Sequence, residues 1–335
     1  MERVLITSIS GQDSIELSKY ILENHPETQV FTLGRRNARA LPRAVIELKE
    51  KYPIRYNMIS GDITDMSSIV HAINICNPEG FFNLAAQSHV GLSFKEPIST
   101  SQITGFGVLN CLEAIRLTNP EIRFYQAGSS EQFGNVILNG ETELINELTP
   151  FRPVSPYACA KVFGHNITKN YRESYGLHAS VGILFNHEGI YRKPDFVTRK
   201  VTIGVNKVLK DKNYKLKLGS QYFARDWGAA SDYVRAMWLM LQQDIADDYV
   251  IATGHKHTGE ELLEIAFGRY NLNWKDHVLF DKEFERPLDL KILLGDASKA
   301  RQVLGWESKT SFKEMIYKML DNDALLLAKY GDILE

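Results

Sequence analysis

The first 184 residues of the chain alternate short apolar runs with longer segments that have the apolar spacing of a helix. The run at 3–7 has no alternation of polar and apolar residues, which is typical of a strand covered on both faces. A regular succession of strand and helix predicts a doubly wound parallel sheet, the Rossmann type of α/β fold. The further runs expected to form strands are 29–33, 54–59, 80–84, 123–127 and 180–184.

Apolar residues three and four positions apart predict the helices that separate these strands. Asp13 and Glu16 have the spacing of a capping box, which predicts a capped start for the first helix. Gly176 is placed to end the helix that starts at Tyr157. The predicted helices are 15–23, 67–76, 104–117, 157–175, 260–270 and 312–328, and a late strand is expected at 248–252.

The regular alternation fades after Asn186, and neither a repeat nor a flexible linker divides the chain. We therefore expect a smaller, mostly carboxyl-terminal α/β lobe that is woven from loops and late helices. The first domain is predicted at 1–184 with a later return of about 224–254, and the second lobe at 185–223 and 255–335.

The composition is that of a soluble globular protein, with 44% hydrophobic and 24% charged residues among 335. Lys and Arg number 39 against 41 Asp and Glu, a balance that does not favour binding to nucleic acid. We expect neither a targeting segment nor a run that spans a membrane, and hence a cytoplasmic protein. Cys76, Cys111 and Cys159 lack metal-ligand spacing, so no metal site is expected, and Cys159 is interpreted as a small packing residue.

Tyr157 and Lys161 are one helical turn apart and would share one face of a helix. A lysine ammonium beside a phenol favours the phenolate and lowers the pKa of the phenol. Tyr157 is therefore a candidate base for a hydroxyl group whose carbon loses a hydride. Pro156 suits the first position of the helix that carries the pair. The alternative is a chance pair on a solvated helix face.

Ser129 and Glu131 follow the buried strand predicted at 123–127. Doubly wound sheets bind their ligands at the carboxyl ends of the strands, so these side chains are expected beside Tyr157 and Lys161. A simple reductase needs no carboxylate next to its Tyr–Lys pair, and Glu131 therefore favours an elimination reaction. The alternative for Glu131 is a solvated turn residue.

The segment 7–14 lies between the first strand and the first helix, where such folds carry a glycine-rich dinucleotide turn. Only the middle glycine, Gly11, is present, and Ser8 and Ser14 hold the other two places. The middle glycine lets the backbone approach the pyrophosphate, and serine is small enough to be accommodated at the other two positions. An ordinary strand–helix turn is the alternative.

Arg35 and Arg36 stand at the end of the second strand, where a site for NAD would carry Asp or Glu to bind the ribose hydroxyls. Arginine at this place matches the 2′-phosphate of NADP instead. We therefore expect NADP as the cofactor. A solvated loop or a contact between subunits is the alternative.

Short motifs lie in order along nearly the whole chain, among them Ser10-Gly11-Gln12-Asp13 and Phe185-Asn186-His187-Glu188. Others are at 61–65, 83–90, 155–158, 170–176, 196–200, 225–228 and 294–296. Together they resemble the GDP-mannose 4,6-dehydratase family of the extended short-chain dehydrogenases/reductases. The resemblance implies conversion of GDP-D-mannose to GDP-4-keto-6-deoxy-D-mannose, a lyase reaction with a tightly held NADP, and assembly into homodimers or homotetramers.

The resemblance also implies a role for individual residues. Tyr157 would be the base for oxidation at C4, with Lys161 tuning it, and Ser129 would bond the C4 oxygen in place of a threonine. Glu131 would remove the C5 proton and help the C6 hydroxyl leave as water. The expected cofactor-binding residues are Ser8, Gly11, Gln12, Asp13, Arg35, Arg36, Asp62, Ile63, Leu84, Ala85, Ala86, Tyr157, Lys161, Asn186 and His187. The expected substrate-binding residues are Ser88, Glu131, Asn186, Lys200, Arg225, Arg286 and Asp289.

The chain departs from the family pattern at several of these places. The family has glycine at positions 8 and 14, threonine at 129, tyrosine where Phe133 stands and glutamate where Asp289 stands. Two alternatives follow from these departures. One is a dehydratase, reductase or epimerase for another GDP-hexose or a GDP-heptose, and the other is a homologue that binds a nucleotide sugar without turnover.

Overall fold

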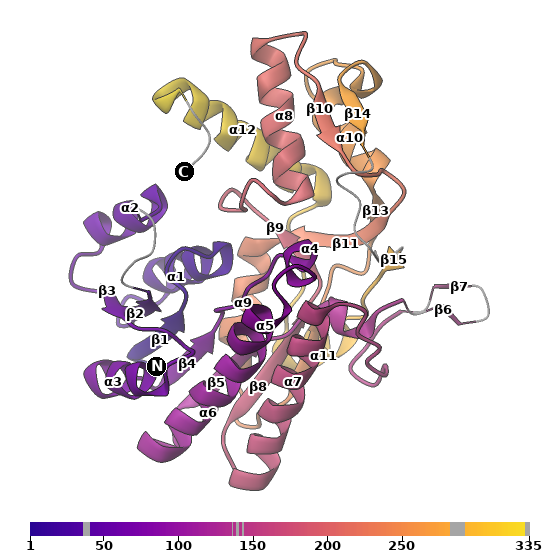
Figure 1. Cartoon of the computed structure of the whole chain (residues 1–335). Coiled ribbons are helices and arrows are strands. Elements are labelled where there is room, and N and C mark those ends of the chain that lie inside the picture. The colour runs from indigo at the N-terminus through magenta and orange to yellow at the C-terminus, as the bar shows by residue number, and fades with distance from the viewer. Residues whose placement is uncertain (36–40, 136, 139–140, 143, 282–291, 332–335) are drawn as a thin grey trace.

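A seven-stranded parallel sheet forms the centre of the first lobe in the computed structural model (Figure 1). The structure describes residues 1–335 except 36–40, 136, 139–140, 143, 282–291 and 332–335. The strand order is β12-β8-β5-β4-β1-β2-β3. The chain adds β2 and β3 on one side of β1 and then returns to add β4 and the later strands on the other side. The strands are β1 (Arg3–Thr7), β2 (Gln29–Gly34), β3 (Tyr56–Ser60), β4 (Gly80–Asn83), β5 (Arg123–Ala127), β8 (Ala179–Leu184) and β12 (Asp248–Ile251).

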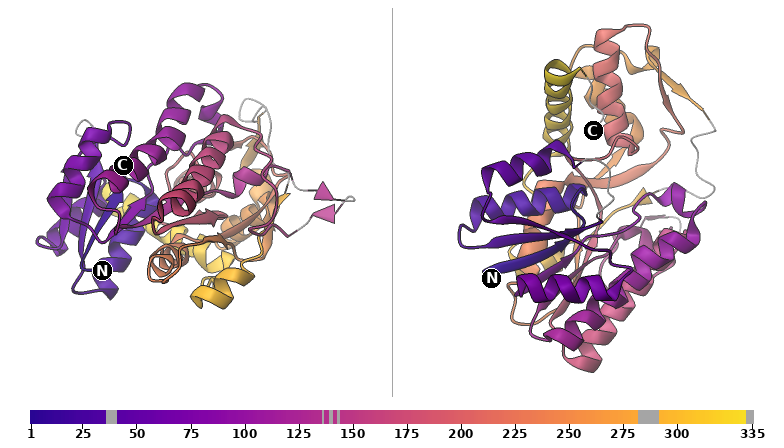
Figure 2. Two further views of the ribbon diagram at one scale, coloured as in Figure 1. Left: turned by 90° about the horizontal axis from the view of Figure 1, so that it is seen from below. Right: turned by 60° about the vertical axis from the view of Figure 1, so that its left-hand side comes forward.

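Helices cover both faces of this sheet (Figure 2). Successive side chains of a strand point to opposite faces, so Val4 and Ile6 enter one apolar core and Leu5 enters the other. The core of Val4 is closed by α1 (Gln12–Asn24), α2 (Arg43–Lys51), α9 (Ala230–Met240) and α11 (Ser298–Leu304). The core of Leu5 is closed by α3 (Met66–Cys76), α6 (Gly107–Thr118) and α7 (Pro156–Tyr175).

A third apolar core belongs to the part of the chain drawn above the sheet in Figure 1. Trp227 stacks on Phe312 there, with ring centroids 5.3 Å apart. Its helices are α8 (Val197–Lys210), α10 (Gly259–Gly268) and α12 (Phe312–Tyr330). Its strands are β10 (Leu216–Leu218), β11 (Ala224–Ala229) and β14 (Val278–Phe280). The short strands β9 (Asn186–Glu188), β13 (Lys256–Thr258) and β15 (Ile292–Leu293) pair with β11.

Short elements complete the described chain. Between β4 and α6 lie α4 (Val90–Ser93), α5 (Pro97–Ser101) and a π-helical turn, η1 (Gln102–Phe106). A 3₁₀ turn, η2 (Ser130–Phe133), follows β5, and the paired strands β6 (Ile137–Leu138) and β7 (Glu141–Thr142) come next. A second 3₁₀ turn, η3 (Trp274–Asp276), precedes β14.

Most of the predicted elements are present, and three expectations fail. The capping box at Asp13 and Glu16 is wrong, because Gly11 is the N-cap of α1 and the Asp13 carboxylate bonds His187 instead. The helix predicted from 104 begins as the π-helical turn η1. Helix α8 in the segment after Asn186 was not predicted, because the carboxyl end of this helix is polar. Gly176 does end α7, in a left-handed conformation with φ of 70°.

Candidate active site

Tyr157 and Lys161 lie in the first two turns of α7, at the carboxyl ends of β4 and β5. The helix begins there because the Ser155 hydroxyl accepts a hydrogen bond of 3.1 Å from the amide of Ala158, and Pro156 occupies the first helical position. Both side chains are almost completely buried, with exposed fractions of 8% for Tyr157 and 5% for Lys161. This burial rules out the alternative that Tyr157 and Lys161 are a chance pair on a solvated helix face.

The lowered pKa that was expected for Tyr157 beside Lys161 is not found in this structure. Burial raises the pKa of Tyr157 to about 12, and the charge of Glu131 acts in the same direction. Burial also lowers the pKa of Lys161 to about 8. The Lys161 ammonium donates to the backbone oxygen of Ala127 at 2.7 Å and lies 5.7 Å from the centroid of the Tyr157 ring. Desolvation penalises the charged form of both groups and is the largest influence on each pKa.

Ser129 and Glu131 stand at the turn that follows β5. The turn has a capping box, in which the Ser129 amide donates to Gln132 Oε1 at 2.8 Å and the Ser129 hydroxyl accepts from the Glu131 amide at 3.3 Å. The Ser129 side chain also hydrogen-bonds Tyr157, a contact that lowers the pKa of the phenol. The structure thus brings Ser129, Glu131 and Tyr157 together, as predicted.

The turn between β1 and α1 holds Ser8 at φ of 77°, in the left-handed region that favours glycine. Ser14 donates a hydrogen bond from its hydroxyl to the backbone oxygen of Ser8, which the sequence did not predict. Gly11 is the N-cap of α1, and no side chain among the described residues caps this helix end. Gln12 is buried, its Nε2 donates to the backbone oxygen of His187 at 3.1 Å, and its Oε1 has no partner among the described residues.

Asp13 and His187 form a hydrogen-bonded ion pair that joins α1 to β9. The Asp13 Oδ2 and His187 Nε2 atoms are 3.0 Å apart, and His187 Nδ1 is 2.8 Å from the backbone oxygen of Phe185. An acceptor at each ring nitrogen favours the protonated form of His187. Burial alone would raise the pKa of Asp13 and lower that of His187, but the pair reverses both effects: the pKa of Asp13 falls to about 2, and that of His187 rises.

A row of buried side-chain hydrogen bonds begins under the loop after β4. The amides of Leu84 and Ala85 each donate to Thr7 Oγ1 at 2.9 Å. Thr7 donates to Asn83 Oδ1 at 2.7 Å, and Asn83 donates to Gln126 Oε1 at 2.8 Å. These bonds fix the loop expected to bind the cofactor against the ends of β1 and β5.

The row ends beside Lys161. Gln126 donates from Nε2 to the backbone oxygen of Ala127 at 2.9 Å, and this oxygen also accepts from Lys161. Thr7, Asn83 and Gln126 are at most 2% exposed. Sequence reasoning missed all three, although a polar residue at the end of an otherwise apolar strand was a usable signal.

The remaining residues expected to bind the cofactor lie at the ends of β2, β3 and β4. Asp62 follows β3 and accepts bonds of 2.9 Å and 2.8 Å from the amide and hydroxyl of Thr64. Ile63 is buried, and Ala86 is partly buried after β4. Arg35 is exposed after β2, whereas Arg36 lies outside the described residues.

The residues expected to bind the substrate come from both lobes. Ser88 is exposed in the loop after β4, and Lys200 is partly buried in the first turn of α8. Asn186 and Arg225 lie on the paired strands β9 and β11, where Arg225 is 5% exposed. The two further positions, Arg286 and Asp289, fall outside the described residues.

The sequence model of the family described as GDP-mannose 4,6 dehydratase matches residues 5–319. The chain belongs to this family. GDP-mannose 4,6 dehydratase 1 of Arabidopsis thaliana is 44% identical over 338 residues, which cover 98% of this chain and 91% of that protein. The GDP-mannose 4,6 dehydratase of Homo sapiens is 38% identical over 351 residues, which cover 96% of this chain and 91% of that protein.

Solved structures of other sugar-nucleotide enzymes share the fold. The dTDP-glucose 4,6-dehydratase of Bacillus anthracis, in complex with NAD, has a TM-score of 0.85 at 20% identity and covers 99% of this chain and 100% of its own. The UDP-glucose 4-epimerase of Thermus thermophilus, also with NAD, has a TM-score of 0.81 at 25% identity and covers 96% of this chain and 98% of its own. These likenesses and the strand order confirm the predicted Rossmann-type fold.

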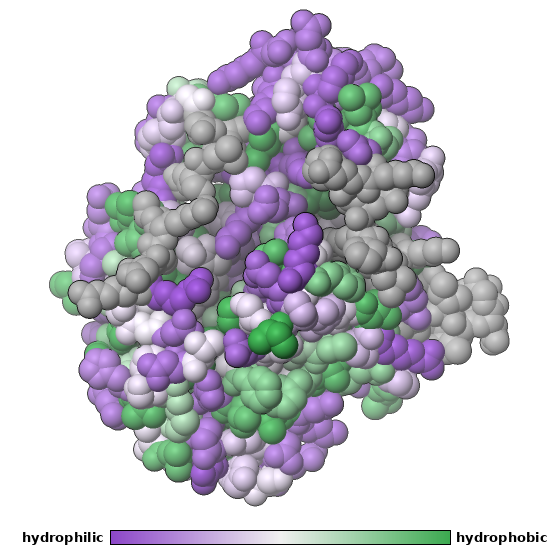
Figure 3. Space-filling model, viewed as in Figure 1, coloured by the Kyte–Doolittle hydropathy of each residue, from purple (hydrophilic) through white to green (hydrophobic). Residues whose placement is uncertain are grey.

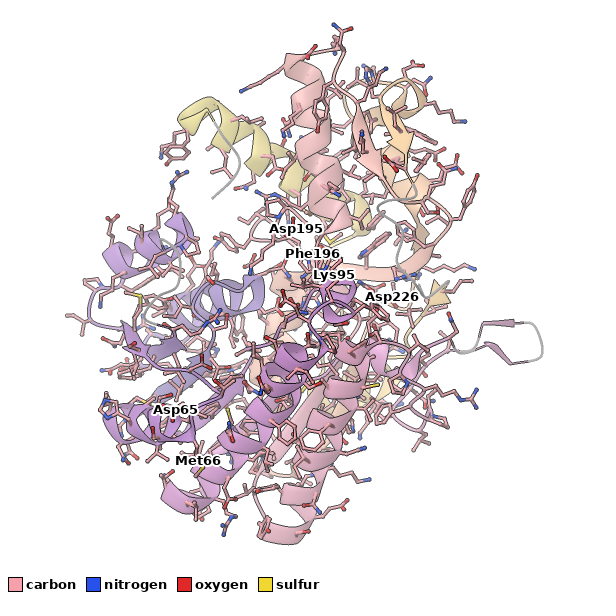
Figure 4. The ribbon with its side chains drawn as sticks, in the orientation of Figure 1. Asp65, Met66, Lys95, Asp195, Phe196 and Asp226 are labelled. Atoms are coloured by element: carbon pink, nitrogen blue, oxygen red, sulfur yellow. The ribbon has the colours of Figure 1, made fainter. Side chains whose placement is uncertain are left out.

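In this member of the dehydratase family, an aromatic contact joins the two lobes at the edge of the site. Phe196 precedes α8, and its ring is 6.0 Å from that of His89 in the loop before α4. The Arg192 guanidinium lies over the Phe196 ring, 3.5 Å from its centroid, and forms an ion pair of 2.9 Å with Glu188. Figure 4 shows Phe196 between α8 and the segment that carries Lys95. Sequence reasoning gave Arg192 and Phe196 no role.

The other site classes considered from sequence give no candidate in the described chain. Among the described residues, no group of three or more His, Cys, Asp or Glu side chains could hold a metal ion. In the same residues, no helix is long and apolar enough to cross a membrane. Cys159 is exposed on α7, so its interpretation as a packing residue is wrong, whereas Cys76 and Cys111 are buried.

Proposed function

We propose that the protein is a GDP-mannose 4,6-dehydratase, a hydro-lyase that converts GDP-D-mannose to GDP-4-keto-6-deoxy-D-mannose and water. The observation that carries the proposal is the carboxylate of Glu131 beside Tyr157 and Ser129 in a chain of this family. Oxidation at C4 needs a base for a hydroxyl proton. Loss of water across C5 and C6 needs a second group for a carbon-bound proton, and Glu131 is suited to that task.

The residues around the first turn fit a dinucleotide cofactor. The amino end of α1 offers backbone amides that no described side chain caps, and these suit a pyrophosphate. Gln12 Oε1 is buried there without a described partner. When bound, NADP would accept a hydride from C4 and return it to C6, and its oxidised ring would add a positive charge beside Tyr157. We favour NADP over NAD because Arg35 follows β2.

Tyr157 and Lys161 carry the first half of the proposed reaction. The Tyr157 oxygen, as the phenolate, takes the proton of the C4 hydroxyl while C4 loses its hydride, so that a ketone forms at C4. The Ser129 hydroxyl, which already bonds Tyr157, holds the C4 oxygen in line. Lys161 stabilises the phenolate as the ammonium and is held near it by the Ala127 carbonyl.

Glu131 carries the second half. The C4 ketone acidifies the C5–H bond, and the Glu131 carboxylate takes that proton. The C6–O bond then breaks, and the same carboxyl group delivers a proton to the leaving hydroxide, so that water departs and a C5–C6 double bond forms. Hydride return to C6 leaves an enolate, and C5 then takes a proton from solvent through the Glu131 carboxyl group. Tyr157 releases to solvent the proton that it took from the C4 hydroxyl, so Tyr157 and Glu131 both return to their starting forms.

The substrate is proposed to lie between the lobes. Asn186, Lys200 and Arg225 would hold the diphosphate, because two cations and an amide donor match its negative charge. Ser88 would contact the hexose, and Arg286 with Asp289 the nucleoside. In this proposal the first lobe, residues 1–184 and about 224–254, binds NADP. The second lobe, residues 185–223 and 255–335, binds the nucleotide sugar. The separate apolar core of α8, α10 and α12 supports the division.

Self-association is proposed to use the surface over α5, α6 and α7, where Figure 3 shows apolar side chains together. Ile98, Phe106 and Phe163 form this patch, with exposed fractions of 71%, 55% and 38%. The rings of Phe106 and Phe163 lie 5.4 Å apart. A homodimer or homotetramer would cover them. A cytoplasmic location is proposed as well, since all three cysteines are free thiols, as is usual in a reducing compartment.

Incubation of the purified chain with GDP-mannose and no added cofactor tests the proposed function. We expect a product lighter than the substrate by one water, with a ketone at C4 and a methyl group at C6. Native mass spectrometry of the same sample should show retained NADP. A 4-epimer or a 4-reduced hexose as the product would contradict the proposal, as would release of unchanged GDP-mannose after prolonged incubation.

A further inference from the structure

The turn between β1 and α1 contains a serine in a conformation that costs L-residues free energy. Ser8 has φ of 77°, the left-handed region that only glycine enters without penalty. The penalty for other residues corresponds to about a 5- to 30-fold preference for leaving this conformation. Something in the surrounding structure must therefore hold Ser8 there.

Both backbone groups of Ser8 are held. Its amide donates to the backbone oxygen of Leu33 in β2 at 2.8 Å. Its carbonyl accepts a hydrogen bond from the hydroxyl of Ser14, which is 1% exposed in the first turn of α1. The next residue, Ile9, packs against Gly34, where a Cβ would come within 2.6 Å of the Ile9 side chain. The peptide after Ser8 thus has a fixed direction.

The Ser8 side chain also explains why position 11 is a glycine. A Cβ at Gly11 would lie 3.0 Å from Ser8 Oγ, closer than side chains normally approach. Ser14 therefore constrains Ser8, which lies six positions before it, and Ser8 in turn restricts position 11 to glycine. A turn with glycine at all three places would need no such hydrogen bond.

We propose that Ser14 is a positioning residue whose hydroxyl holds Ser8 in the left-handed conformation, so that two serines replace two glycines as a coupled pair. The inference rests on the proposed function, in that this turn receives the pyrophosphate of NADP. Ser14 acts through the backbone of Ser8 and not on the cofactor itself. Its contribution to affinity should therefore depend on which residue occupies position 8.

A double-mutant cycle on the full chain tests the coupling. With Ser8 present, Ser14→Ala should weaken NADP binding about three- to tenfold, the usual effect of one lost hydrogen bond. In the Ser8→Gly background the same change should alter affinity by less than about twofold, because glycine adopts positive φ unaided. Ser8→Gly alone should leave NADP affinity unchanged or tighten it.

The midpoint of chemical unfolding of the nucleotide-free chain gives a second readout of the same cycle. It should fall with Ser14→Ala only when Ser8 is present. Ser18→Ala is the matched control, because Ser18 is buried one turn further along α1 and its effect should be equal in both backgrounds. Equal effects of Ser14→Ala in both backgrounds, or none with Ser8 present, would overturn the inference. Coupling in unfolding without NADP binding to any variant would overturn the proposed function and leave this inference standing.

Discussion

At the scale of single residues, burial works against the charged forms of Tyr157 and Lys161 that the proposed reaction uses. The pKa of Tyr157 is raised to about 12 in the nucleotide-free chain, so the positive charge of bound NADP would have to favour the phenolate before the first proton transfer. The pKa of Lys161 is lowered to about 8, which leaves the ammonium close to its own titration. Small changes in charge around this pair therefore act directly on the first proton transfer. Glu131 is one such charge, and it also has a task of its own.

Replacing Glu131 with glutamine should separate the two halves of the reaction. Glu131→Gln keeps size and polarity but removes the base, so dehydration should fall by about 10²- to 10⁴-fold. GDP-mannose should still bind. The measurement is product formation in deuterated water with deuterium located at C5. Glu121→Gln is the control, because Glu121 is exposed just before β5. Near-normal turnover of Glu131→Gln with deuterium at C5 would remove the role assigned to Glu131.

Arg35 is the residue on which the choice of NADP rests. Arg35→Asp removes a cation and adds a carboxylate that suits the hydroxyls of an unphosphorylated ribose. NADP affinity should fall by about tenfold or more, the usual effect of losing a charged hydrogen bond, while NAD affinity changes little. Calorimetry with both cofactors measures this, with Lys51→Asp on α2 as a surface-charge control. An equal loss for both cofactors would make Arg35 a structural residue.

At the scale of elements, the Asp13–His187 pair joins the dinucleotide turn to β9, which begins the second half of the chain. Gln12 reinforces the connection through the His187 backbone oxygen. His187 also stacks on Tyr233 of α9, with ring centroids 4.7 Å apart. Three elements that are far apart in sequence therefore meet at the ring of His187. The stability of this region should therefore depend on pH.

The direction of that dependence follows from the two pKa shifts. The pKa of Asp13 is lowered from 3.8 to about 2, so its stabilisation is present above pH 3.8 and is lost as the pH falls towards 2. The pKa of His187 is raised above 6.5, so its stabilisation is complete below pH 6.5 and is lost as the pH rises through the raised value. Arg192 opposes the charge on His187, and Asp13 outweighs it.

We therefore expect His187→Asn to destabilise the nucleotide-free chain most between pH 3.8 and 6.5. The difference in unfolding free energy from the unaltered chain should shrink as the pH rises further. Urea unfolding at a series of pH values measures it. His71→Asn, at an exposed position of α3, should give no such profile. A difference that is constant with pH would mean that His187 acts by packing alone.

At the scale of the whole molecule, the proposed self-association through Ile98, Phe106 and Phe163 would connect assembly to the site, because Phe163 lies on the same helix as Tyr157 and Lys161. The double variant Phe106→Asp/Phe163→Asp should reduce the mass measured by light scattering to that of one chain, since charge repels charge across a symmetric contact. Leu325→Asp, at an exposed position of α12, is the control and should leave the mass unchanged. Full assembly of the double variant would show that self-association uses another surface.

Sequence patterns predicted the strands of the sheet closely, because each is an apolar run bounded by turn residues. The run expected at 3–7 is β1, and that at 123–127 is β5. The sequence patterns did not predict α8, because the lysines at the end of this helix lower the average hydrophobicity of the segment. Val201, Val205 and Val208 are buried at helical spacing there, so periodicity was a better guide than composition.

The structure brings four of the predicted residues together, but their energetics differ from the expectation. Ser129 and Glu131 follow the carboxyl end of β5, and α7 carries Tyr157 and Lys161 to the same edge, where Lys161 bonds the backbone oxygen of Ala127. The direction of the Tyr157 pKa shift was wrong, since it depends on how many atoms surround the phenol, and spacing along a helix does not reveal that. The bond from Ser14 to Ser8 escaped prediction for a similar reason, because it depends on a single backbone angle.

The strand order of the seven-stranded sheet also has a consequence for how the chain folds during synthesis. The pairs within β1–β2–β3 can form as soon as the first 60 residues are made. The outer edge of β8, in contrast, must wait for β12 at Asp248–Ile251, more than 60 residues later. Distant parallel pairings form slowly, and an uncovered strand edge invites aggregation. Production of this protein should therefore benefit from a low rate of initiation, because fewer incomplete chains with an uncovered β8 edge are then present at the same time.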